Sequence, residues 1–270
     1  MGALSFQIAL FFYLLAMLAA FFDLFKSTKV LPKAAYMFVI VGFLFHTTNV
    51  VYSWFADGHI PIVNAHEATS FFAWCVFLLF LLLEYSYKLG LLGSFIIPIG
   101  FALTLVSSVL SSASKPLTPQ LRSYWLGIHT FFAFMSSAAF ALAAGMALMY
   151  LVQEHHVKRK RLGGLFERLP SLQRLDEISY RLITIGFPLF TLAIISGSIW
   201  ADNAWGSYLS WEPIQVWSII TWLIFAVVFH SRLLAGWRGR RAAVLSIIGF
   251  ATIIIAFAGL ALLQKGQHIF

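Results

Sequence analysis

The chain has 270 residues, of which 61% are hydrophobic and 10% are charged, and its net charge is +8. Soluble domains average about 45–50% apolar and about 25% charged residues, so this chain has too few polar groups to cover a globule in water. The composition predicts a multi-pass membrane protein and excludes a disordered chain. The basic residues form short runs between apolar segments, which is typical of topology signals and argues against nucleic acid as a partner.

Eight runs of mostly apolar residues follow one another, each close to the length of about 20 residues that crosses a bilayer as a helix. We therefore expect an all-α polytopic bundle in which residues 1–270 form a single transmembrane domain. The fifth run is long enough to tilt or to project from the bilayer. The predicted spans are 4–22, 34–55, 69–87, 91–110, 124–152, 182–200, 214–232 and 243–263.

The distribution of Lys and Arg predicts the orientation of this bundle. With the N-terminus outside, all of these residues except Lys115, Arg122 and Lys265 fall in inner segments, of which 153–181 is the one sizeable connection. Because inner segments of membrane proteins are enriched in Lys and Arg, we expect both termini on the outer, periplasmic side. The expected location is the inner membrane of a bacterium.

Four of the eight histidines occupy positions that suit haem iron. On this topology, His129 lies about one turn into the fifth span from its outer end, and His268 lies just beyond the outer end of the eighth. His46 falls near the middle of the second span, and His230 near the inner end of the seventh. Imidazole is the common axial ligand of haem iron, and two histidines from separate helices can form a low-spin site. For each one taken alone, a hydrogen-bonded core histidine is the alternative.

Other metal and redox chemistry has little support in the sequence. The chain contains neither an HExxH motif nor a CxxC motif, which are typical of zinc hydrolases and of redox-active thiol pairs. Its one cysteine, Cys75, lies in an apolar run, so an intramolecular disulfide is excluded. No catalytic nucleophile or acid–base pair stands out.

Five of the nine tryptophans lie between positions 200 and 222. An aromatic belt at the level of the lipid headgroups accounts for Trp200. It accounts less well for the tryptophans of the outer loop 201–213, which contains no Lys or Arg. Such a loop suits a flat apolar ring such as porphyrin. The predicted platform residues are Trp205, Tyr208, Trp211 and Glu212.

These residues resemble a known signature. The run WGSYLSWEP at 205–213, followed by Trp217 and Trp222, is similar to the tryptophan-rich "WWD" signature of the haem-handling cytochrome c assembly family, which includes CcsA, ResC, CcmC and CcmF. The similarity is greatest to CcsA. Further residues that resemble the CcsA pattern are Gly58-His59-Ile60-Pro61, Asn64, Glu67, Trp74, Trp125-Leu126, His129, Phe229-His230-Ser231-Arg232 and His268.

The chain departs from this pattern at four positions. Leu209 stands where the family usually has tryptophan, and Glu212 stands where it has aspartate. Ile214 and Gln215 replace a usual Lys-Glu pair. Glutamate keeps the charge of aspartate on a longer arm, whereas Gln215 removes a charge. These departures leave room for a divergent relative such as HemX.

The resemblance implies a subunit of a cytochrome c haem lyase that takes haem b from the inner side and presents it outside to the CxxCH motif of apocytochrome c. It implies that His230, with His46 or a histidine of a partner, holds haem within the membrane. The outer ligands would then be His129 and His268. A CcsB-like membrane partner is expected. The alternatives are a HemX-like haem-binding accessory protein of tetrapyrrole synthesis and a transporter of another solute.

Overall fold

The computed structural model describes residues 2–26, 28, 30–110, 123–160 and 163–263. All regular structure in these residues is helical, and eight of the helices are long and apolar enough to cross a membrane, which confirms the predicted fold class. The helices are α1 Gly2–Phe25, α2 Val30–Asp57, α3 Ala65–Tyr87, α4 Leu92–Val109, α5 Tyr124–Lys158, α6 Leu165–Arg168, α7 Leu172–Trp205, α8 Pro213–Ala235 and α9 Arg240–Leu263.

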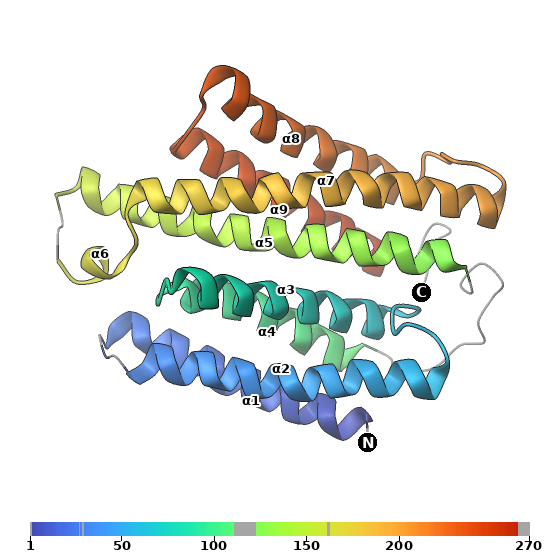
Figure 1. Cartoon of the computed structure of the whole chain (residues 1–270), viewed down its shortest axis with the longest axis horizontal. Coiled ribbons are helices and arrows are strands. Elements are labelled where there is room, and N and C mark those ends of the chain that lie inside the picture. Colours follow the sequence, from blue (N-terminus) through green and yellow to red (C-terminus); the bar gives the residue numbers. More distant parts are fainter. Residues whose placement is uncertain (1, 27, 29, 111–122, 161–162, 264–270) are drawn as a thin grey trace.

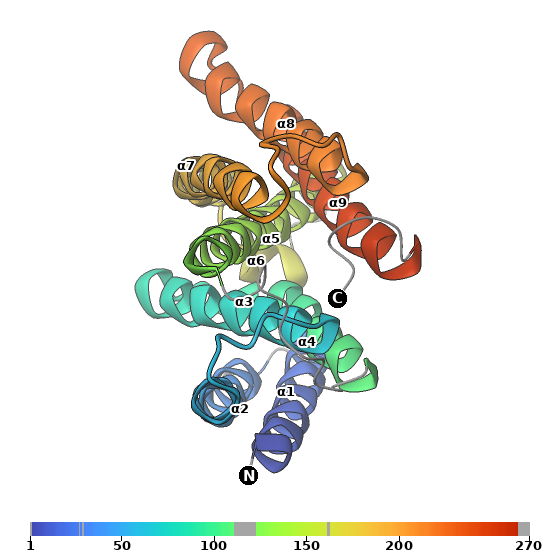
Figure 2. The same ribbon diagram turned by 90° about the vertical axis from the view of Figure 1, so that its right-hand side faces the viewer.

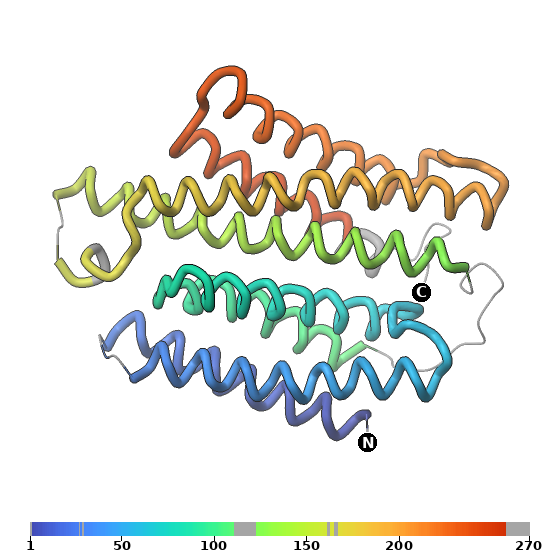
Figure 3. Tube along the Cα trace, viewed as in Figure 1, coloured from blue at the N-terminus to red at the C-terminus, as the bar shows by residue number. Residues whose placement is uncertain are grey.

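The helices are arranged in layers that follow the chain order. In two perpendicular views, α1 and α2 form one side, α3 and α4 lie next to them, and α5 separates these four helices from α7, α8 and α9 (Figures 1 and 2). The trace starts on one side of the bundle at α1 and reaches the opposite side at α8 (Figure 3). Helices α1 to α4 are therefore connected to α7, α8 and α9 mainly by their packing against α5.

The α5 helix occupies the centre of the bundle because much of it consists of small residues. Residues 136–147 contain only Ser, Ala and Gly apart from Phe140, Leu142 and Met146, and all of them are buried. Small side chains let neighbouring helices approach closely within a membrane. A Cβ added at Gly145 would come 2.2 Å from Ile96 of α4, and one added at Gly186 of α7 would come 2.8 Å from the ring of Phe140.

The connection between α5 and α7 is shorter than the sequence predicts. We expected a loop over 153–181, but α5 continues to Lys158 and α7 begins at Leu172. These additional turns contain ion pairs between residues four apart, Glu154–Lys158 and Glu177–Arg181, which stabilise a helix. With 35 residues, α5 is about 50 Å long, well beyond the hydrocarbon thickness of about 30 Å, as its length suggested.

The tryptophan-rich segment that follows the predicted sixth span is also partly helical. We expected a loop from residue 201, but α7 runs to Trp205 and ends at Gly206, whose φ of +73° is left-handed. Glycine adopts this conformation without the clash that a Cβ causes, and it commonly terminates helices. Trp205 is thus fixed to a helix, and the loop proper comprises residues 206–212.

Candidate functional site

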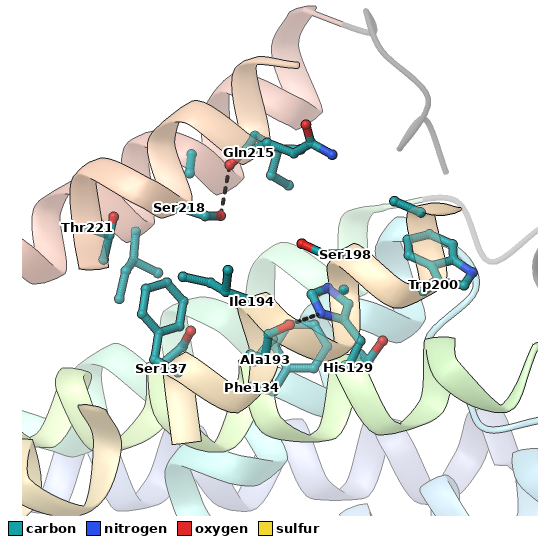
Figure 4. Close-up of a pocket in the computed structure, with 18 of the residues that line it drawn as sticks. His129, Phe134, Ser137, Ala193, Ile194, Ser198, Trp200, Gln215, Ser218 and Thr221 are labelled. Carbon is teal, nitrogen blue, oxygen red and sulfur yellow. Dashed lines mark hydrogen bonds between the residues drawn. The ribbon is translucent and has the colours of Figure 1, made fainter. Parts of the chain in front are cut away.

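An apolar cavity of about 210 Å³ lies among α5, α7, α8 and α9, beside the 206–212 loop (Figure 4). None of the described residues that line it is Asp, Glu, Lys or Arg. Its apolar wall includes Phe134, Phe190, Ile194, Ile214, Ile253 and Phe257. Its polar groups include His129, Thr130, Ser137, Ser198, Gln215, Ser218 and Thr221.

His129 is the one titratable side chain among the described lining residues. Its Nδ1 lies 2.8 Å from the backbone oxygen of Ala193 on α7. Because a carbonyl oxygen can only accept, Nδ1 carries the proton and the lone pair of the neutral ring is on Nε2. Metal-binding histidines are commonly oriented by such a hydrogen bond from the second ring nitrogen.

The ring of His129 packs closely against α7. A Cβ added at Gly197 would come 2.6 Å from Nδ1, so only glycine leaves room for the imidazole. The ring stacks on Trp200 with centroids 6.1 Å apart, and Trp200 in turn meets the edge of Trp205 at 4.9 Å. Trp200 is 3% exposed, so its prediction as a headgroup-belt residue was wrong. These rings form a continuous path from the cavity to the end of α7.

Two contacts fix the 206–212 loop to the helices on either side. The side chain of Gln215, on α8, accepts a hydrogen bond of 2.9 Å from the backbone N–H of Ser210. The Tyr208 hydroxyl donates to the carboxylate of Asp202 on α7, which raises the pKa of Tyr208 above its usual value. The loop therefore has a defined position next to the cavity. Its residue Leu209 forms part of the cavity wall.

The loop presents two aromatic rings on its surface. Tyr208 is 60% exposed and Trp211 is 69% exposed. Trp211 has a left-handed φ of +56°, which is uncommon for a residue other than glycine and an outlier for one so bulky. Strained residues of this kind cluster at functional sites. Glu212 follows at the start of α8, where a carboxylate interacts favourably with the helix dipole.

Comparisons with known proteins show the family to which the chain belongs. The sequence profile of the "Cytochrome C assembly protein" family matches residues 62–268. The cytochrome c biogenesis protein CcsA of Synechococcus sp. (strain CC9902) is 34% identical over 94% of this chain and 91% of its own length. The chain belongs to the cytochrome c assembly family. CcsA of Mesostigma viride is also 34% identical, over 80% of this chain and 78% of its own.

A solved structure has the same fold. The cytochrome c haem lyase CcmF superimposes with a TM-score of 0.70 at 16% sequence identity. The alignment covers 99% of this chain but 50% of CcmF, so this member of the cytochrome c assembly family spans about half of that protein's length. At this identity the similarity concerns the fold alone. The family places the chain in cytochrome c biogenesis, as the sequence predicts.

Of the other candidate histidines, neither His230 nor His46 lines this cavity in the part of the chain that the structure describes. His230 lies on an exposed face of α8, where its Nδ1 contacts the backbone oxygen of Ala226 at 2.9 Å. Its ring meets the edges of Phe187 and Phe229. His268 lies outside the described residues.

His46 lies in the core of the N-terminal helices. It is fully buried, with Nε2 2.9 Å from the hydroxyl of Ser70 and Nδ1 3.3 Å from that of Tyr13. Its helix, α2, lies on the opposite side of the bundle from α8 (Figures 1 and 2), so one chain does not bring His46 and His230 together. A ligand role for His46 remains a prediction, and metal binding would have to displace one of its hydrogen bonds.

The CcsA-like residues before α3 form its N-terminus. Asn64 caps the helix by accepting from the N–H of Glu67 at 2.9 Å, and the Glu67 carboxylate accepts in return from Val63 N and the Asn64 amide. This reciprocal arrangement is a variant of the capping box. Trp74 donates to Thr47 of α2. In this structure these motif residues serve to position α3.

Sequence reasoning missed two residues of the site. Gly197 is not marked by any motif, because the ring that requires it comes from another helix. Gln215 was visible only as a departure from the family pattern, although its oxygen ties down the loop. Glutamate at this position would supply an equivalent acceptor, so the substitution keeps the contact and loses the charge.

Proposed function

We propose that this chain binds haem b at the His129 cavity and presents it on the outer side to the CxxCH motif of apocytochrome c. The observation that carries the proposal is an imidazole oriented by Ala193 at the wall of an apolar cavity beside an exposed tryptophan loop. Haem is the substrate that is handed on. The name of CcmF, a haem lyase, supports the same chemistry for a protein of this fold.

The chemistry of the lining fits haem. An apolar aromatic wall suits the porphyrin ring, and the imidazole suits its iron. With no charged side chain among the described lining residues, the two propionates have to face the loop side, away from the apolar wall. We propose His268 as the second outer ligand. The exposed rings of Tyr208 and Trp211, with Trp205 and Glu212, would position the haem edge.

We propose that haem reaches this site from the inner side with the help of a partner chain. An ionisable side chain within a membrane span is costly unless it is covered, and His230 is on an exposed face of α8. We propose that a second chain, a CcsB-like membrane partner, covers this face and supplies the opposing ligand. This proposal places both termini outside and the chain in the inner membrane of a bacterium.

In the attachment step, each of two thiols adds across a vinyl group of haem. For each thiol, the S–H bond and the π bond of the vinyl group break, one carbon–sulfur bond and one carbon–hydrogen bond form, and the thiol hydrogen is retained in the product. This chain contributes orientation, which can account for a large part of a rate enhancement. We therefore propose that it is a subunit of a haem lyase that acts by holding and presenting its substrate.

One observation favours a second function, that of a HemX-like accessory protein that binds haem without attaching it. Leu209 contributes to the cavity wall at a position where the family usually has tryptophan, so the platform has one ring fewer. A non-attaching relative would tolerate this loss. In that case the protein would bind haem at the same cavity.

Complementation separates the two functions. The chain is expressed, together with a CcsB-like partner, in a strain that lacks its own haem lyase, and periplasmic c-type cytochromes are measured by haem staining. Restored cytochromes in the native protein but not in His129→Ala support the lyase subunit. Haem bound to the purified chain without restored cytochromes supports the accessory protein.

A further inference from the structure

Two buried carboxylate oxygens among the described residues have no hydrogen-bond partner, and both belong to side chains that line one small cavity. They are Oδ1 of Asp23, at the end of α1, and Oε2 of Glu84, near the end of α3. The Asp23 side chain is 1% exposed. An unsatisfied buried carboxylate oxygen is costly, so a native structure normally supplies it with a partner.

The other oxygens of these carboxylates are already engaged. Oδ2 of Asp23 pairs with the guanidinium of Arg168 on α6, which also donates to the backbone oxygen of Asp23. Oε1 of Glu84 accepts from Gly90 N at 3.0 Å. Among the described lining residues and their ion-pair partners, two carboxylates stand against one guanidinium, and this balance favours a cation over a neutral water.

The cavity is small and lined by oxygen donors. Its volume of about 10 Å³ is close to the minimum that accommodates a single water-sized particle. Ser94 also lines it, and because its hydroxyl proton is given to the Ala20 carbonyl at 2.9 Å, the Ser94 oxygen retains lone pairs. Carboxylate and hydroxyl oxygens are the ligands that hard cations prefer.

We propose that this cavity binds one alkali-metal cation of the size of Na⁺, held by Asp23, Glu84 and Ser94. The cation joins the ends of α1 and α3 to the start of α4. The same Asp23 carboxylate binds Arg168 of α6, so the site lies next to the contact between α6 and the N-terminal helices. The three residues that hold the cation do not line the His129 cavity, so this proposal does not depend on the proposed haem function.

The proposal is tested on the purified full-length protein by thermal unfolding in NaCl and in choline chloride at equal ionic strength. We expect a saturable rise of the unfolding temperature that is specific to Na⁺, and binding of one radioactive Na⁺ per chain. Glu84→Gln should lose both. The control, Glu177→Gln, removes the same charge from an exposed ion pair with Arg181 and should keep both.

Equal unfolding temperatures of the native protein in the two salts, without sodium binding, would overturn the proposal and indicate water or a shared proton. A sodium response that persists in Glu84→Gln would overturn it as well. Should Glu84→Gln fail to fold, Glu84→Asp keeps the charge on a shorter arm and should raise the sodium concentration needed for half-saturation. An unchanged concentration in that variant contradicts the site.

Discussion

The imidazole of His129 fills the space that a side chain at Gly197 would occupy. A Cβ at position 197 would lie 2.6 Å from Nδ1 and 2.8 Å from Cε1 of the ring, distances that real Cβ atoms essentially never show. The two residues belong to α5 and α7, whose close packing also brings the Ala193 carbonyl to Nδ1. Gly197 therefore determines the position of the His129 ring as much as the hydrogen bond to Ala193 does.

Gly197→Ala is expected to turn the His129 ring away from its present position. Disturbing the support of a metal-binding histidine typically lowers metal affinity by about 10- to 100-fold, and we expect a loss of haem affinity in that range. Haem titration of the purified variant measures it. Gly163→Ala, at a glycine with open space around it, is the matched control. Native haem affinity in Gly197→Ala would show that the ring position is irrelevant to haem.

Gln215→Ala should loosen the tryptophan loop. The variant loses the acceptor of the Ser210 N–H. A hydrogen bond of this kind contributes about 1 kcal/mol to stability. Its loss corresponds to roughly fivefold faster amide exchange at Ser210. Gln215→Glu keeps an acceptor and should exchange at the native rate. Hydrogen exchange read by mass spectrometry compares the three proteins. Equal protection in Gln215→Ala would mean that the loop is held by other contacts.

Trp211→Gly should separate backbone strain from the function of the ring. Glycine removes the left-handed strain, which costs about 1–2 kcal/mol, whereas Trp211→Ala retains it. Since the ring is 69% exposed, little packing is lost, and the glycine variant should unfold at a higher temperature than the alanine variant. Both should mature less cytochrome c. A less stable glycine variant would show that the φ of Trp211 carries no strain.

Replacing Leu209 with Trp and Glu212 with Asp restores two positions of the family signature. Both positions lie in the 206–212 loop and neither side chain is buried, so we expect a change in stability within roughly 0.5 kcal/mol. If the chain is a lyase subunit adapted to its own partner, cytochrome c maturation in the double variant should stay at or below the native rate. A gain from an inactive native protein would identify these two positions as the limit on attachment and favour the accessory function.

The eight spans could be predicted because each is a long apolar run between polar segments, and a bilayer admits few alternatives for such a run. The ends of α5 and α7 could not be predicted from the sequence. Residues 172–181 are charged enough to indicate a loop, yet they form a helix with Ser171 as its N-cap. A charged helical turn outside the hydrocarbon and a polar loop have similar compositions, so composition does not distinguish them.

The predicted aromatic loop agrees with the exposed rings of Tyr208 and Trp211, but the burial of Trp200 against His129 was not foreseen. Sequence gives the depth of a residue in a span and not the neighbour that it faces. For the same reason, His46 and His230 looked alike in the sequence. One is enclosed by Tyr13 and Ser70, and the other is exposed on α8.

The most direct test of the account is the absorption spectrum of the reduced, purified protein. We predict bound b-type haem with a low-spin, bis-histidine spectrum in the native chain. His129→Ala and His268→Ala should each lose haem or shift it to a high-spin form, whereas His66→Ala, whose Nδ1 contacts Ser107, should keep the native spectrum. A native protein without haem, or a spectrum unchanged in both His129→Ala and His268→Ala, would contradict the proposed site.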